Sequence, residues 1–170
     1  PHCHLVFVGE NDGGDYGRQL LLDMQSAGGR ARVTGWADSE AFRRYLNAAD
    51  FAVQLRTLSK GETSGTVLDA MCHGVPVIAN ANGSMAWLPR EAVLLLDEEF
   101  TDAQLVEALT RLREDDALRG AMGRAGRAII ETRHAPAHCA AMYAQAIEDF
   151  AAQQQVSADG VAAAIGVHLA

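Results

Sequence analysis

The strongest constraint on the fold of this chain is the segment Lys60–Ser84, in which turn, helix, turn and strand signals follow one another. The hydroxyl side chains of Thr63 and Ser64 can cap a helix, and apolar side chains then recur at helical spacing. The sequence Gly-Val-Pro at 74–76 ends that helix, because glycine tolerates a left-handed turn and proline cannot continue the helix. The apolar run 75–79 predicts a short strand that is buried on both faces.

Strand and helix patterns alternate along most of the chain, which is typical of an α/β protein with a doubly wound, Rossmann-like parallel sheet. Apolar runs predict strands at residues 5–8, 32–35, 51–55, 76–80 and 92–96. Ligands of such sheets bind at the carboxyl ends of the strands. The loops expected to share that edge are Gly9–Gly14, Gly35–Ala37, Leu55–Glu62 and Asn80–Ser84.

The length of 170 residues and the 49% hydrophobic content favour one domain with an aliphatic core. We predict this domain over residues 1–152, with Ser39 capping one of its helices and a helical region from Asp102 onward. Residues 153–170 are rich in Ala, Gln and Gly, and they predict a tail or a short extra helix.

Composition and charge exclude several functional classes. The net charge is −8 and the basic residues form no stripe, so nucleic acid is not an expected partner. The three cysteines are widely spaced and odd in number, which indicates a reducing compartment such as the cytoplasm. His2, Cys3 and His4 lie together, but no second ligand pair follows at zinc spacing, so we expect no metal.

The start of the helix after Ser64 is the candidate binding site. A helix that begins after a loop of small residues offers free N–H groups and a positive dipole end, which attract phosphate. These groups belong to the segment Thr63–Thr66, whose hydroxyls serve equally well as an ordinary helix cap, and both roles can hold at once. Arg56 and Lys60 can add positive charge, and the acids Glu62 and Asp69 flank the site. This combination suits a ligand with both phosphates and hydroxyls.

The order of these motifs resembles the C-terminal, donor-binding half of retaining GT-B glycosyltransferases, the glycosyl transferases group 1 family. The matching motifs are Glu62, Gly65, Asp69-Ala70-Met71, Gly74–Ile78 and Gly83-Ser84. The resemblance extends over about residues 5–145, through Leu5–Gly9, Val33–Gly35 and Tyr45–Asp50.

The resemblance implies transfer of a sugar from a nucleotide-diphosphate sugar to a saccharide or lipid-linked acceptor, in glycan or lipopolysaccharide assembly of the bacterial type. It implies a catalytic role for Glu62 at the transferred sugar and a ribose contact for Asp69. The donor-binding residues that it implies are Gly35, Arg56, Lys60, Thr63, Ser64, Gly65 and Thr66, with Gly83 and Ser84 as a turn beside the sugar or acceptor. It implies no metal or other cofactor.

The family places the acceptor on a preceding N-terminal domain, and an Arg and a Lys that contact the diphosphate on a loop before Leu5. We therefore expect this chain to be a fragment that binds donor weakly and transfers nothing alone. The resemblance also implies peripheral association of the full-length protein with the inner face of a membrane.

Three features depart from the family pattern. Six residues separate Glu62 from Asp69 where the family has seven, the second acid is Asp rather than Glu, and Trp87 stands where many members carry Glu. These departures leave open a non-catalytic nucleotide-sugar-binding or interaction module, and a nucleotide-sugar epimerase. A pure interaction module would have no affinity for nucleotides, and an epimerase would turn over donor without acceptor.

Overall fold

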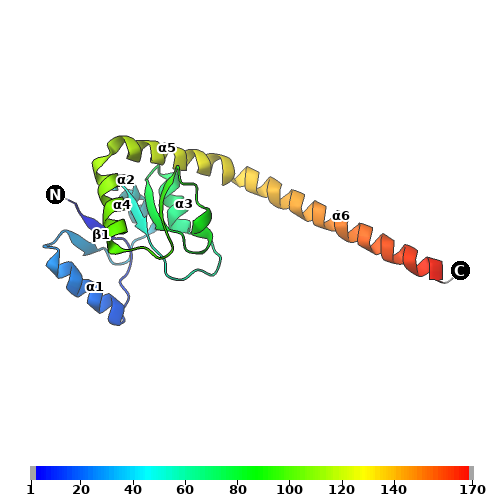
Figure 1. Cartoon of the computed structure of the whole chain (residues 1–170), viewed down its shortest axis with the longest axis horizontal. Helices are drawn as coiled ribbons and strands as arrows, with labels where there is room; N and C mark the ends of the chain where they lie inside the picture. The colour runs from blue at the N-terminus through cyan, green and yellow to red at the C-terminus, as the bar shows by residue number, and fades with distance from the viewer. Residues whose placement is uncertain (1–2, 169–170) are drawn as a thin grey trace.

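The computed structural model describes residues 3–168, in which strands and helices alternate along the chain (Figure 1). The strands are β1 (Leu5–Phe7), β2 (Ala31–Val33), β3 (Ala52–Gln54), β4 (Val77–Asn80) and β5 (Val93–Leu96). The helices are α1 (Asp15–Ser26), α2 (Ser39–Ala48), α3 (Gly65–Cys72), α4 (Asp102–Glu114), α5 (Asp116–Arg133) and α6 (Pro136–His168), with a 3-10 helix, η1, at Gly83–Trp87. All the paired strands are parallel, so the predicted α/β class is confirmed.

The core surrounds β4, the central strand of a three-stranded sheet with the order β3-β4-β5. Side chains alternate across a strand, so Val77 and Ala79 pack in one cluster with Met71 of α3. Ile78 faces the opposite side and packs with Leu112 of α4. Every residue of β4 is buried, as the apolar run predicted.

The end of α3 fixes how the chain enters β4. The N–H of Val75 donates to the carbonyl of Ala70, and the N–H of Gly74 donates to the carbonyl of Met71. This pair of bonds is the Schellman arrangement, and it requires the positive φ of 71° that Gly74 adopts. Arg127 of α5 adds a bond to the carbonyl of His73.

Two predicted helix caps differ in detail. Asp38, rather than Ser39, caps α2, because its carboxylate accepts a hydrogen bond from the N–H of Ala41. Ser64 is the N-cap residue of α3 by position, but within the described residues its hydroxyl makes no capping bond and contacts the hydroxyl of Thr66 instead.

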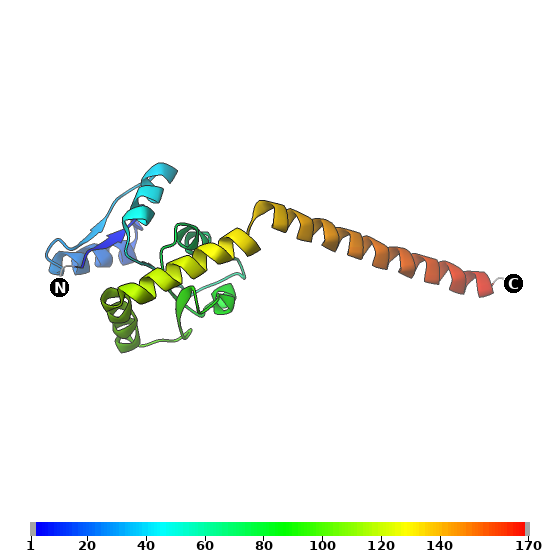
Figure 2. The ribbon, with the colours of Figure 1, turned by 90° about the horizontal axis from the view of Figure 1, so that it is seen from above.

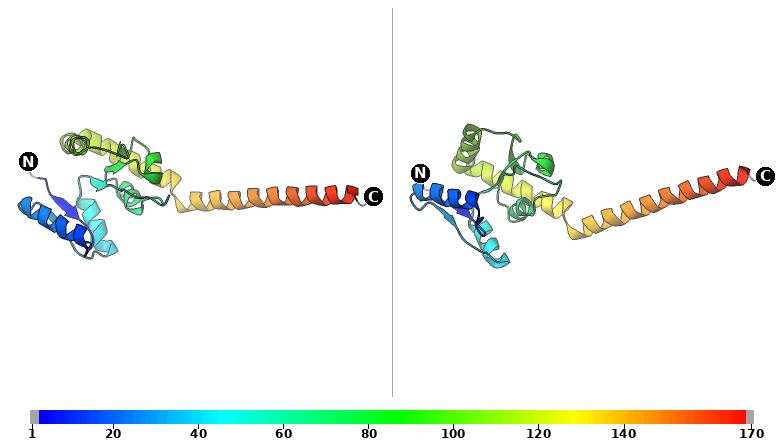
Figure 3. Two further views of the ribbon diagram at one scale, coloured as in Figure 1. Left: turned by 60° about the horizontal axis from the view of Figure 1, so that its bottom comes forward. Right: turned by 90° about the horizontal axis from the view of Figure 1, so that it is seen from below.

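The strands do not form one continuous sheet. β1 pairs only with β2, in a separate two-stranded sheet. Figures 2 and 3 show this pair and α1, in blue, set apart from the green strands of the other sheet. Few side chains here reach the interior, and Gly17 and Leu46 are the buried residues of α1 and α2. The loops expected at one edge therefore follow the strands of two separate sheets.

The last helix, α6, projects far from the body of the molecule (Figure 1). It continues from Pro136 to His168, so the described part of segment 153–170 extends α6 rather than forming a separate element. Within residues 3–168 none of the helices combines the length and apolar character needed to cross a membrane.

Two glycines on α5 provide a matched test of its packing. An added Cβ at Gly123 would lie 2.1 Å from the carbonyl oxygen of Gly74, whereas one at Gly120 would meet only the flexible end of Arg124. We expect Gly123→Ala to lower the free energy of unfolding by about 1–3 kcal/mol through overpacking. Gly120→Ala should leave it unchanged or raise it by up to about 1 kcal/mol through helix propensity. Urea denaturation of both variants checks this, and equal effects would contradict the close packing of α5 on α3.

Candidate functional site

The side chain of Asn80 anchors the loop that follows β3. Its Oδ1 accepts from the N–H of Arg56 at 2.8 Å, and its Nδ2 donates to the carbonyl of Arg56 at 2.8 Å. A third bond of 3.3 Å runs from Nδ2 to the carbonyl of Glu98. Asn80 is only 2% exposed, so these bonds are shielded from water. The carboxyl ends of β3, β4 and β5 are therefore held together by one amide.

This anchor places the Arg56 guanidinium beside the predicted catalytic acid. Nη1 of Arg56 donates to Oε1 of Glu62 at 2.6 Å, and the N–H of Lys60 donates to Oε2 at 2.7 Å. The hydroxyl of Ser84 donates to the backbone carbonyl of Glu62 at 2.6 Å. Both carboxylate oxygens thus hold the loop in shape, and half of the side chain stays accessible at 51% exposure.

The same contacts lower the pKa of Glu62. The main causes are hydrogen bonds from the backbone N–H groups of Glu62 itself and of Lys60. Desolvation opposes them, and the charge and the hydrogen bond of Arg56 lower the pKa further. The carboxylate is therefore ionised at neutral pH.

The first residue of α3, Gly65, lies three residues after Glu62, and this end of the helix has an open side. Ser64, Val67 and Ala70 are buried, whereas Gly65, Thr66 and Asp69 are exposed. The three exposed residues therefore share the solvent face of α3. A Cβ at Gly65 would meet nothing within 4 Å, so there is space in front of the first N–H groups. The hydroxyl of Thr66 donates to Oε1 of Gln54 on β3, which ties this end of the helix to the sheet.

The turn Gly83-Ser84 closes over the same loop. Gly83 has a φ of +59°, and an added Cβ would lie 2.2 Å from Oγ of Ser59. The N–H of Gly61 in turn donates to that Oγ at 3.1 Å. The predicted turn residues therefore touch the loop of Glu62 directly.

The other predicted residues are exposed around this loop. Lys60, Thr63 and Asp69 are solvent-accessible, and within the described residues their side chains make no hydrogen bond or ion pair. Asp69 contributes its backbone carbonyl to the N–H of His73. These side chains remain available to a ligand.

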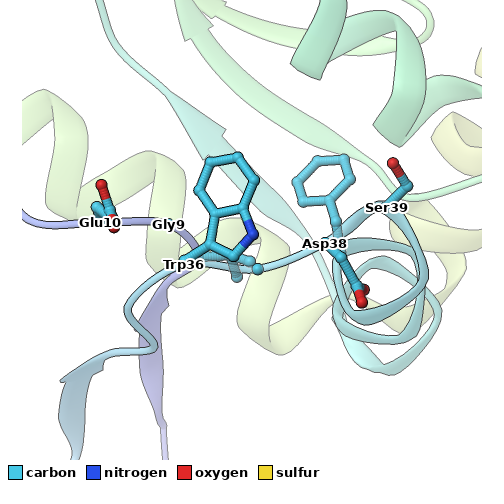
Figure 4. Close-up of a pocket in the computed structure, with 8 residues that line it drawn as sticks. Gly9, Glu10, Trp36, Asp38 and Ser39 are labelled. Atoms are coloured by element: carbon cyan, nitrogen blue, oxygen red, sulfur yellow. The ribbon is translucent and has the colours of Figure 1, made fainter.

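A second group of loops forms a cavity of about 280 Å³ at the carboxyl ends of β1 and β2 (Figure 4). Its lining residues are Val8, Gly9, Glu10, Trp36, Ala37, Asp38, Ser39 and Phe42. Gly35 adjoins the cavity with a φ of +73°, and the N–H of Gly9 donates to Oγ1 of Thr34. The indole of Trp36 stands at the cavity and is 79% exposed.

The sequence analysis identified the loops of this site but missed several of the residues that shape it. Asn80, Asn82 and Glu98 form a linked cluster, in which Nδ2 of Asn82 donates to Oε1 of Glu98 at 2.8 Å. A polar residue at the end of a buried apolar strand was the available signal for Asn80, since such a group must find partners. Glu10 and Phe42 carried no comparable signal.

Among residues 3–168, no three His, Cys, Asp or Glu side chains come together as a metal site requires. His2, part of the cluster considered above, lies outside the described residues.

Comparison with known proteins assigns the chain to a family. The model of the family described as glycosyl transferase-like matches residues 1–145. The chain belongs to this family. It is also 34% identical, over 136 residues, to the GDP-mannose-dependent monoacylated alpha-(1-6)-phosphatidylinositol monomannoside mannosyltransferase of Corynebacterium glutamicum. That alignment covers 77% of this chain and 35% of the relative.

Solved structures show the same fold. Sucrose-phosphate synthase from Thermosynechococcus elongatus matches with a TM-score of 0.70 and 27% identity, over 88% of this chain and 39% of its own. Anabaena HepE in complex with UDP-glucose matches with a TM-score of 0.73 and 18% identity, over 86% and 41%. The chain thus spans between a third and a half of the length of these relatives.

Because Asn80 anchors the loop after β3, we expect its substitution to lower the stability of the fold strongly. We expect Asn80→Leu to lower the free energy of unfolding, because each buried backbone group left unpaired costs about 1–3 kcal/mol. The control is Asn47→Leu at an exposed position of α2, where a change within about 0.5 kcal/mol is expected. Urea denaturation of both variants measures this. Equal stability of the two would show that the Asn80 bonds are replaced by water.

The contacts of Glu62 predict that its contribution to folding stability depends on pH. Because its pKa is lower in the folded than in the unfolded chain, its contribution to stability is present above the unfolded pKa and is lost as the pH falls through the folded pKa. A carbon-13 NMR titration should place the Glu62 midpoint below the ordinary value. Arg56→Gln should raise that midpoint only part of the way, because the backbone donors remain. A midpoint at or above the ordinary value would exclude this loop geometry.

Proposed function

We propose that this chain is the donor-binding half of a retaining glycosyltransferase that uses a nucleotide-diphosphate sugar. The observation that carries the proposal is the open N-terminus of α3 beside the Arg56–Glu62 pair. An open helix N-terminus favours a phosphate, and a held, ionised carboxylate favours a positively charged sugar carbon. Family membership and the solved relatives support the same reading.

The proposed chemistry divides the work between two elements. The N–H groups of Thr63–Thr66 and the ammonium of Lys60 hold the diphosphate as negative charge develops on it, when the bond to the sugar breaks. Glu62 lies beside the sugar, with Gly83 and Ser84 forming the adjacent wall, and Asp69 accepts a hydrogen bond from a ribose hydroxyl. The nucleoside occupies the cavity near Gly35, where Trp36 offers a flat apolar surface. The reaction proposed here uses no metal or other cofactor.

The acceptor is proposed to be a glycan or a lipid-linked saccharide, bound by a further domain of the full-length protein. The Corynebacterium relative is named for a mannosylated phosphatidylinositol acceptor and for GDP-mannose as donor. We therefore take GDP-mannose as the first donor to test, a polysaccharide or lipopolysaccharide assembly pathway as the setting, and the inner face of a membrane as the location.

The donor class follows from a thermal-shift panel of UDP-, GDP-, ADP- and CMP-sugars. A ligand at about 100 times its dissociation constant should stabilise the chain by about 2.7 kcal/mol, which appears as a raised melting temperature. The shift should fall in Glu62→Ala and Asp69→Ala and persist in the control Glu131→Ala on the exposed side of α5. Absence of any shift, with full-length protein as well as with this chain, would contradict the proposal.

A substitution at Gly65 tests ligand binding without disturbing the fold. We expect Gly65→Ala to fold normally, since its Cβ meets nothing within 4 Å and its φ is not positive. The new methyl would occupy the space proposed for the phosphate, so the dissociation constant of the nucleotide sugar should rise about tenfold or more. Isothermal titration calorimetry measures the affinity. Unchanged affinity would remove the phosphate from the α3 N-terminus.

The two tryptophans give a matched test of the nucleoside cavity. Trp36 lines the cavity, whereas Trp87 is 89% exposed at the end of η1 and is not part of it. In Trp87→Phe, nucleotide should change the fluorescence of Trp36, and in Trp36→Phe the signal of Trp87 should stay constant. The reverse pattern would place the nucleoside elsewhere.

The second candidate is a non-catalytic nucleotide-sugar-binding or interaction module of the same fold. The engagement of both Glu62 oxygens within its own loop favours it. Such a module in its full-length form would bind donor without transfer. A nucleotide-sugar epimerase would consume donor without acceptor.

A further inference from the structure

The short helix η1 directs one exposed aromatic side chain toward the loop of Glu62. A 3-10 helix has three residues per turn, so side chains at positions i and i+3 lie above one another. Asn82, just before η1, and Met85 are buried on one side, at 7% and 1% exposure. Ser84 and Trp87 share another side, and the hydroxyl of Ser84 donates to the backbone carbonyl of Glu62. The indole of Trp87 therefore lies on the side of η1 that faces this loop, about 6 Å along the helix axis from Ser84.

The loop of Glu62 itself presents a second apolar side chain beside η1. Leu58 lies on this loop, and its neighbour Ser59 contacts the start of η1, since a Cβ added to Gly83 would lie 2.2 Å from Oγ of Ser59. Trp87 is 89% exposed and Leu58 is 85% exposed. In the described part of the chain these are the two most exposed large apolar side chains. They belong to two segments that touch each other beside the candidate catalytic acid.

The surroundings of these two side chains indicate what kind of partner they fit. Large contiguous apolar patches mark contacts with proteins or membranes. Here the residues that adjoin them in the sequence are polar, and Lys60, Arg90 and Glu91 are all exposed. Two apolar contact points among polar groups suit a ligand with the same mixture, such as a sugar that carries an apolar chain. Indole offers a flat apolar face to the C–H groups of a sugar ring, and its N–H donates to a hydroxyl.

We propose that Trp87 and Leu58 form a subsite for the acceptor. The indole of Trp87 stacks on the sugar ring that receives the transferred sugar, and Leu58 contacts an apolar chain attached to that ring. The proposal rests on the proposed function, because it places the acceptor beside Glu62, where the transferred sugar is proposed to lie. It narrows the acceptor from any glycan to a saccharide with an apolar chain. The remainder of the acceptor is left to the further domain of the full-length protein.

The affinities of simple glycosides test the subsite in the full-length protein. Methyl and octyl α-glycosides of mannose, glucose and galactose are titrated below their micelle concentrations, and binding is followed by ligand-observed NMR. Each methylene group that leaves water contributes roughly fourfold in affinity. With two or more methylene groups packed on Leu58, at least one octyl glycoside should bind about tenfold or more tightly than its methyl counterpart.

Substitutions separate the two halves of the subsite. Leu58→Ala should remove most of the preference for the octyl chain and leave the affinity for the methyl glycoside unchanged. Trp87→Ala should weaken both glycosides by about threefold to tenfold, because both share the stacked ring. The matched controls are Leu22→Ala and Tyr16→Ala on α1, where the side chains are 58% and 73% exposed. Neither control should change either affinity.

Four results would overturn the proposal. The first is the absence of saturable binding for all six glycosides, and the second is equal affinity for the methyl and octyl forms. The third is an octyl preference that survives Leu58→Ala, which would place the chain elsewhere. The fourth is binding to vesicles of phosphatidylcholine and phosphatidylglycerol that is lost in Trp87→Ala while no glycoside binds, which would identify a membrane contact instead.

The thermal shift with nucleotide sugars distinguishes this proposal from the proposed function. Both Trp87→Ala and Leu58→Ala should retain the shift of the unsubstituted protein, which also shows that they are folded. A retained shift without glycoside binding would remove the subsite and leave the proposed function intact. Glycoside binding without any shift in the unsubstituted protein would remove the proposed function instead.

Discussion

The candidate site depends on one buried amide, the side chain of Asn80. Its three hydrogen bonds join the ends of β3, β4 and β5 at the edge where parallel sheets bind ligands. Because Asn80 fixes both backbone polar groups of Arg56, it determines where the guanidinium meets Glu62. The hydroxyl of Ser84 then holds the loop of Glu62 by donating a hydrogen bond to the backbone carbonyl of Glu62. A small number of polar bonds, held on a fully buried strand, thus sets the geometry of residues that are themselves exposed.

Charge at the site is balanced more closely than the overall charge of −8 suggests. Arg56 is paired with Glu62, so its charge is largely neutralised before any ligand arrives. The remaining attraction for a diphosphate comes from the N-terminal end of α3 and from Lys60. The described residues therefore offer only a limited positive potential to a diphosphate.

Local signals in the sequence were sufficient to predict the part of the fold around α3 and β4. The residues Gly74 to Pro76 required a left-handed turn and a helix stop, and the Schellman bonds confirm both. The run 77–79 predicted a strand buried on both faces, and the two core clusters confirm it. The first half was predicted less well, because strand patterns reveal which residues are extended but not which strands are neighbours. The single continuous sheet that we expected is therefore two sheets in the structure.

The sequence by itself determined the α/β class and the position of α3 after a loop of small residues. These follow from turn chemistry and periodicity, which act over a few residues. Only the tertiary structure decided that Asn80 holds Arg56, and that β1 and β2 form a sheet separate from that of β3, β4 and β5. Those facts depend on contacts between segments some 20 or more residues apart, such as Arg56 and Asn80 at a separation of 24, and local patterns cannot encode them.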